Sequence, residues 1–181
     1  MFERLLARTA LKLENAGIPY MVKRGQAVLL HGEPRLTRDI DITVGISGEE
    51  LGRILGVVSG LRFRILPDDA EAFVKKTMVL PVLHPASGIR IDFIFSYSPY
   101  ARQAIGRARG VELGGKTVRF ATAEDLVIHK VFAGRERDIE DARLVLLKNP
   151  SLDVGYIAKW LREFDAALNE DFASRFGGLL S

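Results

Sequence analysis

The sequence predicts a mixed α/β fold, with a sheet flanked by helices and a helical C-terminal part. Up to residue 120, short β-branched and aromatic runs alternate with segments of helical spacing, as expected for a sheet covered by helices. From residue 122 onward the apolar residues follow helical spacing alone. At 181 residues the chain is long enough for one domain with a proper core.

The elements of the first part follow from local periodicity and turn residues. Apolar residues at helical spacing from Phe2 to Leu13 predict a first helix, which Gly17 ends. Gly114-Gly115 predicts the turn of a β-hairpin. The remaining elements are expected in this order: strand 18–23, helix 25–32, strand 38–44, helix 47–58, helix 68–76, strands 77–83 and 88–96, helix 98–108, and hairpin strands 111–113 and 117–120.

Three helices are expected after the hairpin, at 122–134, 136–148 and 151–168. Thr122 is a natural N-cap, and Asp125 stands where a capping box usually has Glu. We divide the chain into a domain at 1–148 and a helical extension at 149–181 packed on it. The last long helix is expected to bury an apolar stripe, namely Ile157, Trp160, Leu161, Phe164 and Leu168.

Composition narrows the classes of function. The net charge is +3. Because the chain has no cysteine, disulfides and cysteine-based zinc sites are excluded. The N-terminus does not have the pattern of a signal peptide and no apolar run is long enough for a membrane span, so we expect a cytoplasmic protein. A basic stretch could attract triphosphates or an RNA backbone, or could simply be a solvated surface: Arg102, Arg107, Arg109, Lys116 and Arg119, against Glu112.

The expected strand at 38–44 carries two carboxylates. Alternation places Asp39 and Asp41 on one face of the strand and Ile40 and Ile42 on the other. Strands select against Asp, and two close like charges repel unless a cation lies between them. The pair therefore indicates a site for a hard divalent metal. The alternative is an Asp pair that caps a strand end or a turn.

A third acid, Asp92, lies in the apolar strand expected at 88–96. A carboxylate among such neighbours is disfavoured without a partner. Three carboxylates on adjacent strands could hold two Mg²⁺ ions about 4 Å apart, which activates an attacking oxygen and stabilises a leaving phosphate. The alternative is that Asp92 forms an ion pair with Arg90 or Arg119 at a sheet edge.

The order of the segments carries more information than any one of them. A strand, a turn at Gly25, a short helix and a strand with Asp39-x-Asp41 follow one another, and Asp92 comes later. A glycine turn between strand and helix can form a backbone-amide nest for phosphate. This order resembles the nucleotidyltransferase (polymerase β-like) superfamily, and the match spans roughly residues 18 to 147.

The C-terminal half extends the resemblance. The run with Asp125, Leu126 and Lys130, followed by Gly134-Arg135 and then Asp138 and Asp141, is similar to the nucleotidyltransferase-like toxins of bacterial abortive-infection and toxin–antitoxin systems. That resemblance implies that Lys130 contacts the triphosphate and that Asp138 or Asp141 assists catalysis. Without it, Lys130 would be an exposed helical lysine and residues 137–141 a solvated, salt-bridged helix face.

The resemblance implies that the chain transfers a nucleoside monophosphate from an NTP such as ATP to an RNA, tRNA or protein acceptor and releases pyrophosphate. Asp39, Asp41 and Asp92 would hold two Mg²⁺ ions, and Asp92 would also take the proton of the acceptor hydroxyl. Asp138 would be the late acid. The residues expected around the nucleotide phosphates are Gly25, Gln26, Arg35, Thr37 and Lys130.

Arg24 departs from the family pattern, which has two small residues at this turn. Its guanidinium could donate to the triphosphate or obstruct the pocket. The obstructing case favours a second hypothesis, a catalytically degenerate member that binds a cognate antitoxin or toxin protein. A third hypothesis is an RNA-binding module that uses the basic stretch without transfer.

Overall fold

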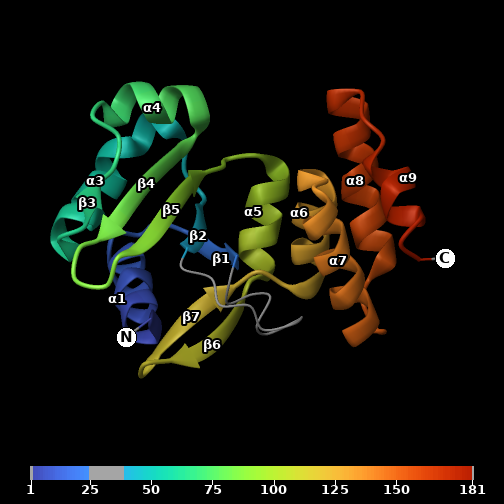
Figure 1. Ribbon diagram of the computed structural model, residues 1–181, viewed down its shortest axis with the longest axis horizontal. Helices are drawn as coiled ribbons and strands as arrows, with labels where there is room; N and C mark the ends of the chain where they lie inside the picture. Colours follow the sequence, from blue (N-terminus) through green and yellow to red (C-terminus); the bar gives the residue numbers. More distant parts are fainter. Residues whose placement is uncertain (1, 25–38, 181) are drawn as a thin grey trace. The chain divides into compact units, whose positions relative to one another are not determined.

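The computed structural model describes residues 2–24 and 39–180, which form two compact units. The sheet unit comprises residues 2–24 and 39–121, and the helical unit comprises residues 122–180. The predicted α/β class with a helical C-terminal part is confirmed (Figure 1). The helix expected at 25–32 lies outside the described residues, and the boundary expected at residue 148 stays a prediction.

The described residues of the sheet unit form a seven-stranded mixed sheet in the order β3-β4-β5-β2-β1-β7-β6. β2 is parallel to β5 and β1 is parallel to β7, whereas the other neighbouring strands are antiparallel. The two-residue strand β3 was not predicted, because alternation cannot show in so short a segment. The strands are β1 (Tyr20–Arg24), β2 (Asp39–Val44), β3 (Arg64–Ile65), β4 (Val79–His84), β5 (Ile89–Phe95), β6 (Arg109–Leu113) and β7 (Lys116–Phe120).

The helices of the sheet unit begin and end close to their sequence signals. Gly17, just after α1, has a φ of 63°, a conformation that glycine adopts without steric cost. The Ser98 side chain caps α5 by accepting the Ala101 N–H at 3.0 Å. These helices are α1 (Phe2–Asn15), the 3₁₀ turn η1 (Gly48–Glu50), α3 (Leu51–Leu61), α4 (Ala70–Thr77) and α5 (Pro99–Arg107).

The centre of the sheet has one apolar face and one polar face. Ile40 and Ile42 of β2 lie beside Ile91 and Phe93 of β5, and all four are fully buried. Burying each of these side chains contributes about 1.5–3 kcal/mol to folding. The alternate positions of the same two strands carry the polar residues, so the hydrophobic pattern fixes the register that brings the acids together.

The helical unit contains α6 (Ala123–Ala133), α7 (Glu136–Lys148), α8 (Val154–Leu168) and α9 (Phe172–Gly177). Thr122 caps α6 as predicted, because its hydroxyl accepts the Asp125 N–H at 3.2 Å. Gly134 ends α6 with a φ of 66°. α8 begins three residues later than expected, because Asp153 serves as its cap and accepts the Tyr156 N–H at 2.9 Å.

The predicted apolar stripe of α8 is correct except at its end. Ile157, Trp160 and Leu161 are buried, but Leu168 is 53% exposed. The chain turns directly after Leu168, at Asn169 in the left-handed conformation, and continues into α9, which was not predicted. Phe172 of α9 is buried and stacks on Phe132 with ring centroids 5.0 Å apart.

No helix in the described part of the chain is long and apolar enough to cross a membrane.

Candidate functional site: an acidic face of the central strands

The parallel pairing of β2 and β5 brings the predicted acids together. Asp41 lies opposite Asp92 in the register, and Asp39 lies opposite Arg90. Neighbouring strands are about 4.8 Å apart, and residues two apart on a strand share a face. Asp39, Asp41, Arg90 and Asp92 therefore form one cluster, here called the acidic face.

Within the acidic face, Arg90 forms a two-pronged ion pair with Asp92. Its Nε donates to Oδ1 at 2.7 Å and its Nη2 donates to Oδ2 at 3.1 Å. The Arg90 side chain is 46% exposed, whereas that of Asp92 is 20% exposed. The predicted pairing of Asp92 with Arg90 thus occurs, but in the interior of the sheet rather than at its edge.

The charge of Arg90 responds to all three carboxylates. The pKa of Arg90 is raised above its ordinary value, first by the hydrogen bond to Asp92. Partial burial opposes this shift, and the negative charges of Asp92, Asp39 and Asp41 add to it. One guanidinium therefore provides positive charge to a cluster of three acids. From the sequence, we expected an ion pair of Arg90 with Asp92 only as the alternative to a metal site.

The donor chemistry of the acidic face suits a hard divalent cation, since its three acids offer only carboxylate oxygens. Asp41 is buried, with 7% of its surface exposed, while Asp39 is exposed to solvent. As the side chains stand, however, no group of three or more His, Asp or Glu residues within 2–24 and 39–180 could hold a metal ion. Both oxygens of Asp92 accept a hydrogen bond from Arg90, so a metal bound by all three acids would either share Asp92 with the guanidinium or displace it.

The helical unit contains a second cluster, here called the lysine cluster: Lys130, Arg135, Asp138 and Asp141. Lys130 Nζ donates to Asp138 Oδ1 and to Asp141 Oδ2, both at 2.8 Å. Arg135 Nε donates to Asp138 Oδ2 at 2.9 Å. As predicted from their spacing, Asp138 and Asp141 share a face of α7.

The alternative of an exposed Lys130 is wrong, and the alternative of a solvated face at 137–141 is wrong for Asp138 and Asp141, although Arg137 and Glu140 are exposed. Lys130 is 8% exposed, and Asp138 and Asp141 are each 6% exposed. Burial alone would raise the pKa of Asp138, but the hydrogen bond and charge of Lys130, helped by Arg135, hold that pKa below its usual value. The cluster is thus an ion-pair network that joins α6 to α7.

We compared the sequence with protein families and curated proteins, and the fold with solved structures. No protein-family model matches the sequence, and no curated protein matches it. Among solved structures, the antibiotic-resistance factor ANT(2″)-Ia in solution has a TM-score of 0.61 and 17% identity, covering 92% of this chain and 94% of its own. Its crystal structure in complex with adenylyl-2″-tobramycin has a TM-score of 0.58 and 19% identity, covering 96% and 98%. An antigenic nucleotidyltransferase-like protein from Paracoccidioides brasiliensis has a TM-score of 0.56 and 15% identity, covering 96% and 90%.

The chain has the nucleotidyltransferase fold. The resemblance drawn from the order of the sequence segments is thereby confirmed at the level of the fold. At sequence identities of 15–19%, the likeness to these three structures is a likeness of fold. The nearer likeness to toxins of abortive-infection systems stays a prediction.

Several predicted phosphate-binding residues of the nucleotidyltransferase fold lie outside the described residues, namely Gly25, Gln26, Arg35 and Thr37. The side chain of Arg24 is not described either; its backbone lies at the end of β1, opposite Asp41 across an irregularity in the ladder. Lys130 and Asp138 are described, and they belong to the helical unit, whereas the acidic face belongs to the sheet unit. Their predicted roles in catalysis stay predictions.

The basic stretch between residues 101 and 120 is partly used within the sheet unit. Arg119 Nη2 donates to the carbonyl oxygens of Ile105 and Ala108, at 3.5 and 3.4 Å. Arg102 lies over the Tyr97 ring, 5.0 Å from its centroid. These contacts stabilise local structure, so the stretch is not a free basic surface throughout.

Sequence reasoning also missed a buried carboxylate network in the helical unit. Asp125 is fully buried, and its Oδ2 accepts the Thr122 hydroxyl while its Oδ1 accepts the Tyr156 hydroxyl, both at 2.8 Å. The Asp at the third helical position was noticed as a capping signal. Tyr156 gave no signal, because its contact with Asp125 joins residues 31 positions apart.

Proposed function

We propose that this protein is a metal-dependent nucleotidyltransferase. It transfers a nucleoside monophosphate from an NTP to an acceptor hydroxyl and releases pyrophosphate. The observation that carries the proposal is the pairing of Asp41 with Asp92, with Asp39 on the same face, in a chain that has the nucleotidyltransferase fold. The three acids that the sequence singled out are distributed over two strands, and the sheet register brings them together.

Each acid has a role that follows from its place. Asp39 and Asp41 hold divalent metal, and Asp92 holds metal and accepts the proton of the acceptor hydroxyl. When bound, the metal activates the attacking oxygen and neutralises charge on the leaving phosphate. Arg90 has a half-exposed side chain and can turn toward solvent, where its guanidinium suits phosphate oxygens. Asp92 is thus the acid that Arg90 and a bound metal would both contact.

The predicted phosphate contacts of Gly25, Gln26, Arg35 and Thr37 are part of this proposal. Lys130 is supported less by its surroundings, because two carboxylates already engage its ammonium group. The predicted late acid, Asp138, is one of those two carboxylates. Lys130→Ala separates a role of Lys130 in NTP binding from a structural role, because the first lowers the affinity for NTP and the second lowers stability.

The test is transfer of label from α-labelled NTPs in the presence of Mg²⁺. We expect a labelled acceptor and loss of the label with Asp39→Asn and Asp41→Asn, since each substitution removes a metal ligand. Asp68→Asn is the matched control, because Asp68 is an exposed acid of the sheet unit outside the acidic face. Full transfer by Asp41→Asn, or equal loss in Asp68→Asn, would contradict the proposal.

The acceptor is tested in the same assay. ANT(2″)-Ia was solved in complex with an adenylylated antibiotic, which supports ATP as donor and a small polyhydroxylated molecule as acceptor. Tobramycin, total RNA and a protein extract are therefore offered in separate reactions. Label on RNA or protein would instead support the acceptors implied by the resemblance to toxins.

A second candidate is a catalytically inactive member that binds a toxin or antitoxin partner. The observation that favours it is the Arg90–Asp92 ion pair, which occupies the acid needed for proton transfer. Such a protein would show neither label transfer nor Mg²⁺-dependent nucleotide binding. If the ion pair is what blocks the site, Arg90→Gln should restore Mg²⁺-dependent nucleotide binding that the parent lacks, whereas an active parent already shows that binding.

A further inference from the structure

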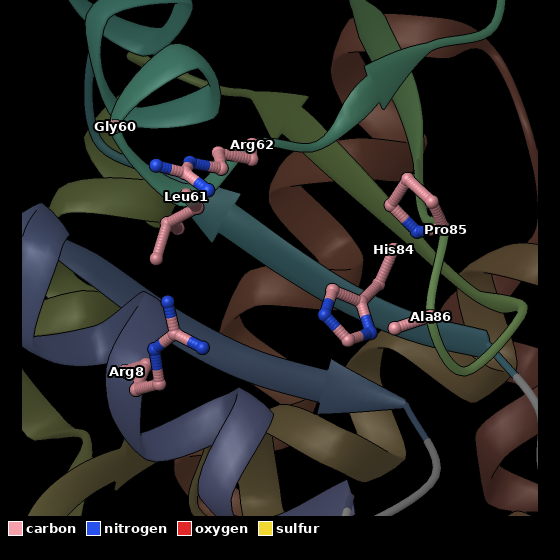
Figure 2. A pocket seen from close by; sticks show the side chains of 7 residues that line it. All are labelled: Arg8, Gly60, Leu61, Arg62, His84, Pro85 and Ala86. Carbon is pink, nitrogen blue, oxygen red and sulfur yellow. The ribbon is translucent and has the colours of Figure 1, made fainter.

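A pocket of about 570 Å³ lies in the sheet unit, away from the acidic face. Arg8 of α1, Arg62 after α3 and His84 at the end of β4 supply its polar lining, and Leu61 and Pro85 supply apolar lining. Figure 2 shows the side chains of Arg8 and Arg62 on the same side of the pocket with Leu61 between them, and the His84 ring extending toward Arg8.

The strand register places this pocket on the other face of the sheet. His84 lies opposite Ile89, and Leu83 lies opposite Arg90. Residues opposite each other in a ladder share a face, and successive residues alternate. His84 is therefore on the face of Ile89 and Ile91, whereas Arg90 and Asp92 are on the acidic face.

Within residues 2–24 and 39–180, the arginines of the pocket have no acidic partner. Neither Arg8 nor Arg62 forms an ion pair with any residue in the described part of the chain. Lys12, one turn after Arg8 on α1, adds a third cation at the rim, since a methyl group at Gly60 would lie 3.5 Å from its Nζ. Converging cations repel one another, so an anion between them would lower the free energy of the folded protein.

His84 supplies a ring nitrogen to the pocket. Its Nδ1 is 2.7 Å from Ser87 Oγ, and the same oxygen accepts the Ile89 N–H at 3.3 Å. This contact holds the ring so that its other nitrogen, Nε2, lies on the side that faces Arg8.

Arg62 ends α3 with φ 58° and ψ 38°, the left-handed region in which glycine is the usual residue after a helix. A side chain here costs folding free energy that glycine would not, so Arg62 can be replaced by glycine without loss of stability from the backbone.

From these observations we propose that the pocket is a second anion site, which binds a phosphate-bearing small molecule of about nucleotide size. Two guanidinium groups and an imidazole ring supply the planar donors that phosphate oxygens accept. The volume lies within the range of small-molecule sites, roughly 300–1,000 Å³. Because the site lies on the face opposite the acids, it is independent of the transfer reaction proposed above.

The test is calorimetric titration of the full chain with AMP, pyrophosphate and inorganic phosphate in buffer without divalent metal. We expect the parent to bind at least one of them with a Kd of about 1 mM or tighter. Arg62→Gly should raise that Kd about tenfold, the loss of one charge-assisted hydrogen bond, while the melting temperature stays equal or rises. Tighter binding of AMP would identify a nucleotide, and equal binding of all three would identify the phosphate group alone as the ligand.

Arg64→Ala is the matched control, because it removes the same charge two residues away. Arg64 lies opposite Leu83 and hence on the face away from His84, so its variant should bind as the parent does. The proposal fails if the parent binds none of the three anions, if Arg62→Gly binds as well as the parent, or if Arg64→Ala weakens binding equally.

Discussion

The acidic face and the lysine cluster are both ion-pair networks, but they differ in exposure. Arg90 of the acidic face has 46% of its side chain exposed and holds a single acid by two hydrogen bonds. Lys130 has 10% of its side chain exposed and holds two acids from the next helix. A solvated cation can leave its partner at little cost, whereas a buried one cannot. The comparison indicates that exchange with a metal or substrate is open to the acidic face and that the lysine cluster stabilises the fold.

The largest expected effect follows removal of the buried cation. Lys130→Ala should lower the free energy of unfolding of the helical unit by about 3–5 kcal/mol, because it leaves the Asp138 and Asp141 carboxylates buried with one partner fewer. Denaturation followed by Trp160 fluorescence measures this directly, since the single Trp lies in α8.

Arg143→Ala is the control for Lys130, because Arg143 is an exposed cation of α7. That variant should lie within about 0.5 kcal/mol of the parent. If Lys130→Ala instead keeps the stability of the parent and loses affinity for NTP, Lys130 is the phosphate lysine that the resemblance implies.

The second largest effect is a loss of folding stability at alkaline pH, which comes from Tyr20 in the sheet unit. Burial, chiefly, raises the pKa of Tyr20 from 10.0 to about 12, and its hydroxyl lies between Glu14 and the Arg119 N–H. The unfolded chain loses this proton near pH 10 while the folded chain keeps it, so stability falls as pH rises from about 10 to about 12. The loss is at most about 2–3 kcal/mol, at about 1.4 kcal/mol per pKa unit.

Tyr20→Phe should flatten this alkaline decline, as measured by chemical denaturation at a series of pH values. Tyr97→Phe is the matched control, since Tyr97 is 58% exposed. An unchanged alkaline slope in Tyr20→Phe would assign the decline to other groups.

At acid pH the lysine cluster should weaken. The pKa of Asp138 lies below 3.8 in the folded chain, so the unfolded chain binds the proton first as pH falls. Stability from this group is therefore complete well above pH 3.8 and is lost as pH falls through the lowered folded pKa. Asp138→Asn should be less stable at neutral pH and less sensitive to acid, as measured by the melting of the Trp160 signal between about pH 2 and 6.

The smallest change in stability is expected at Arg90. Arg90→Gln removes a half-exposed ion pair and should change the free energy of unfolding by about 1 kcal/mol or less. Its effect on ligands should be larger, because Asp92 is no longer bonded to a competing cation. Calorimetry with Mn²⁺ or Mg²⁺ should show several-fold tighter binding than in the parent. Weaker metal binding would mean that Arg90 helps to assemble the site rather than compete for it.

Local patterns in the sequence predicted a large part of the fold. Strand alternation at Asp39–Val44, the helix start at Ser98, the cap at Thr122 and the stop at Gly17 each depend on residues a few positions apart, and all are present. The errors lie where local pattern is short or interrupted, as at β3 and at the turn after Leu168. There the contacts of the finished fold decide which residues are buried.

By itself, the sequence determined that Asp39 and Asp41 share a face and that Asp138 and Asp141 share another, because alternation and helical spacing follow from backbone geometry. Only the tertiary structure decided that Asp41 lies opposite Asp92, that Arg90 rather than Arg119 bonds to Asp92, and that Lys130 is buried between two acids. These contacts depend on which strands pair and on how two helices pack. Strand pairing and helix packing are set by burial of the whole apolar surface, a quantity that no short segment carries.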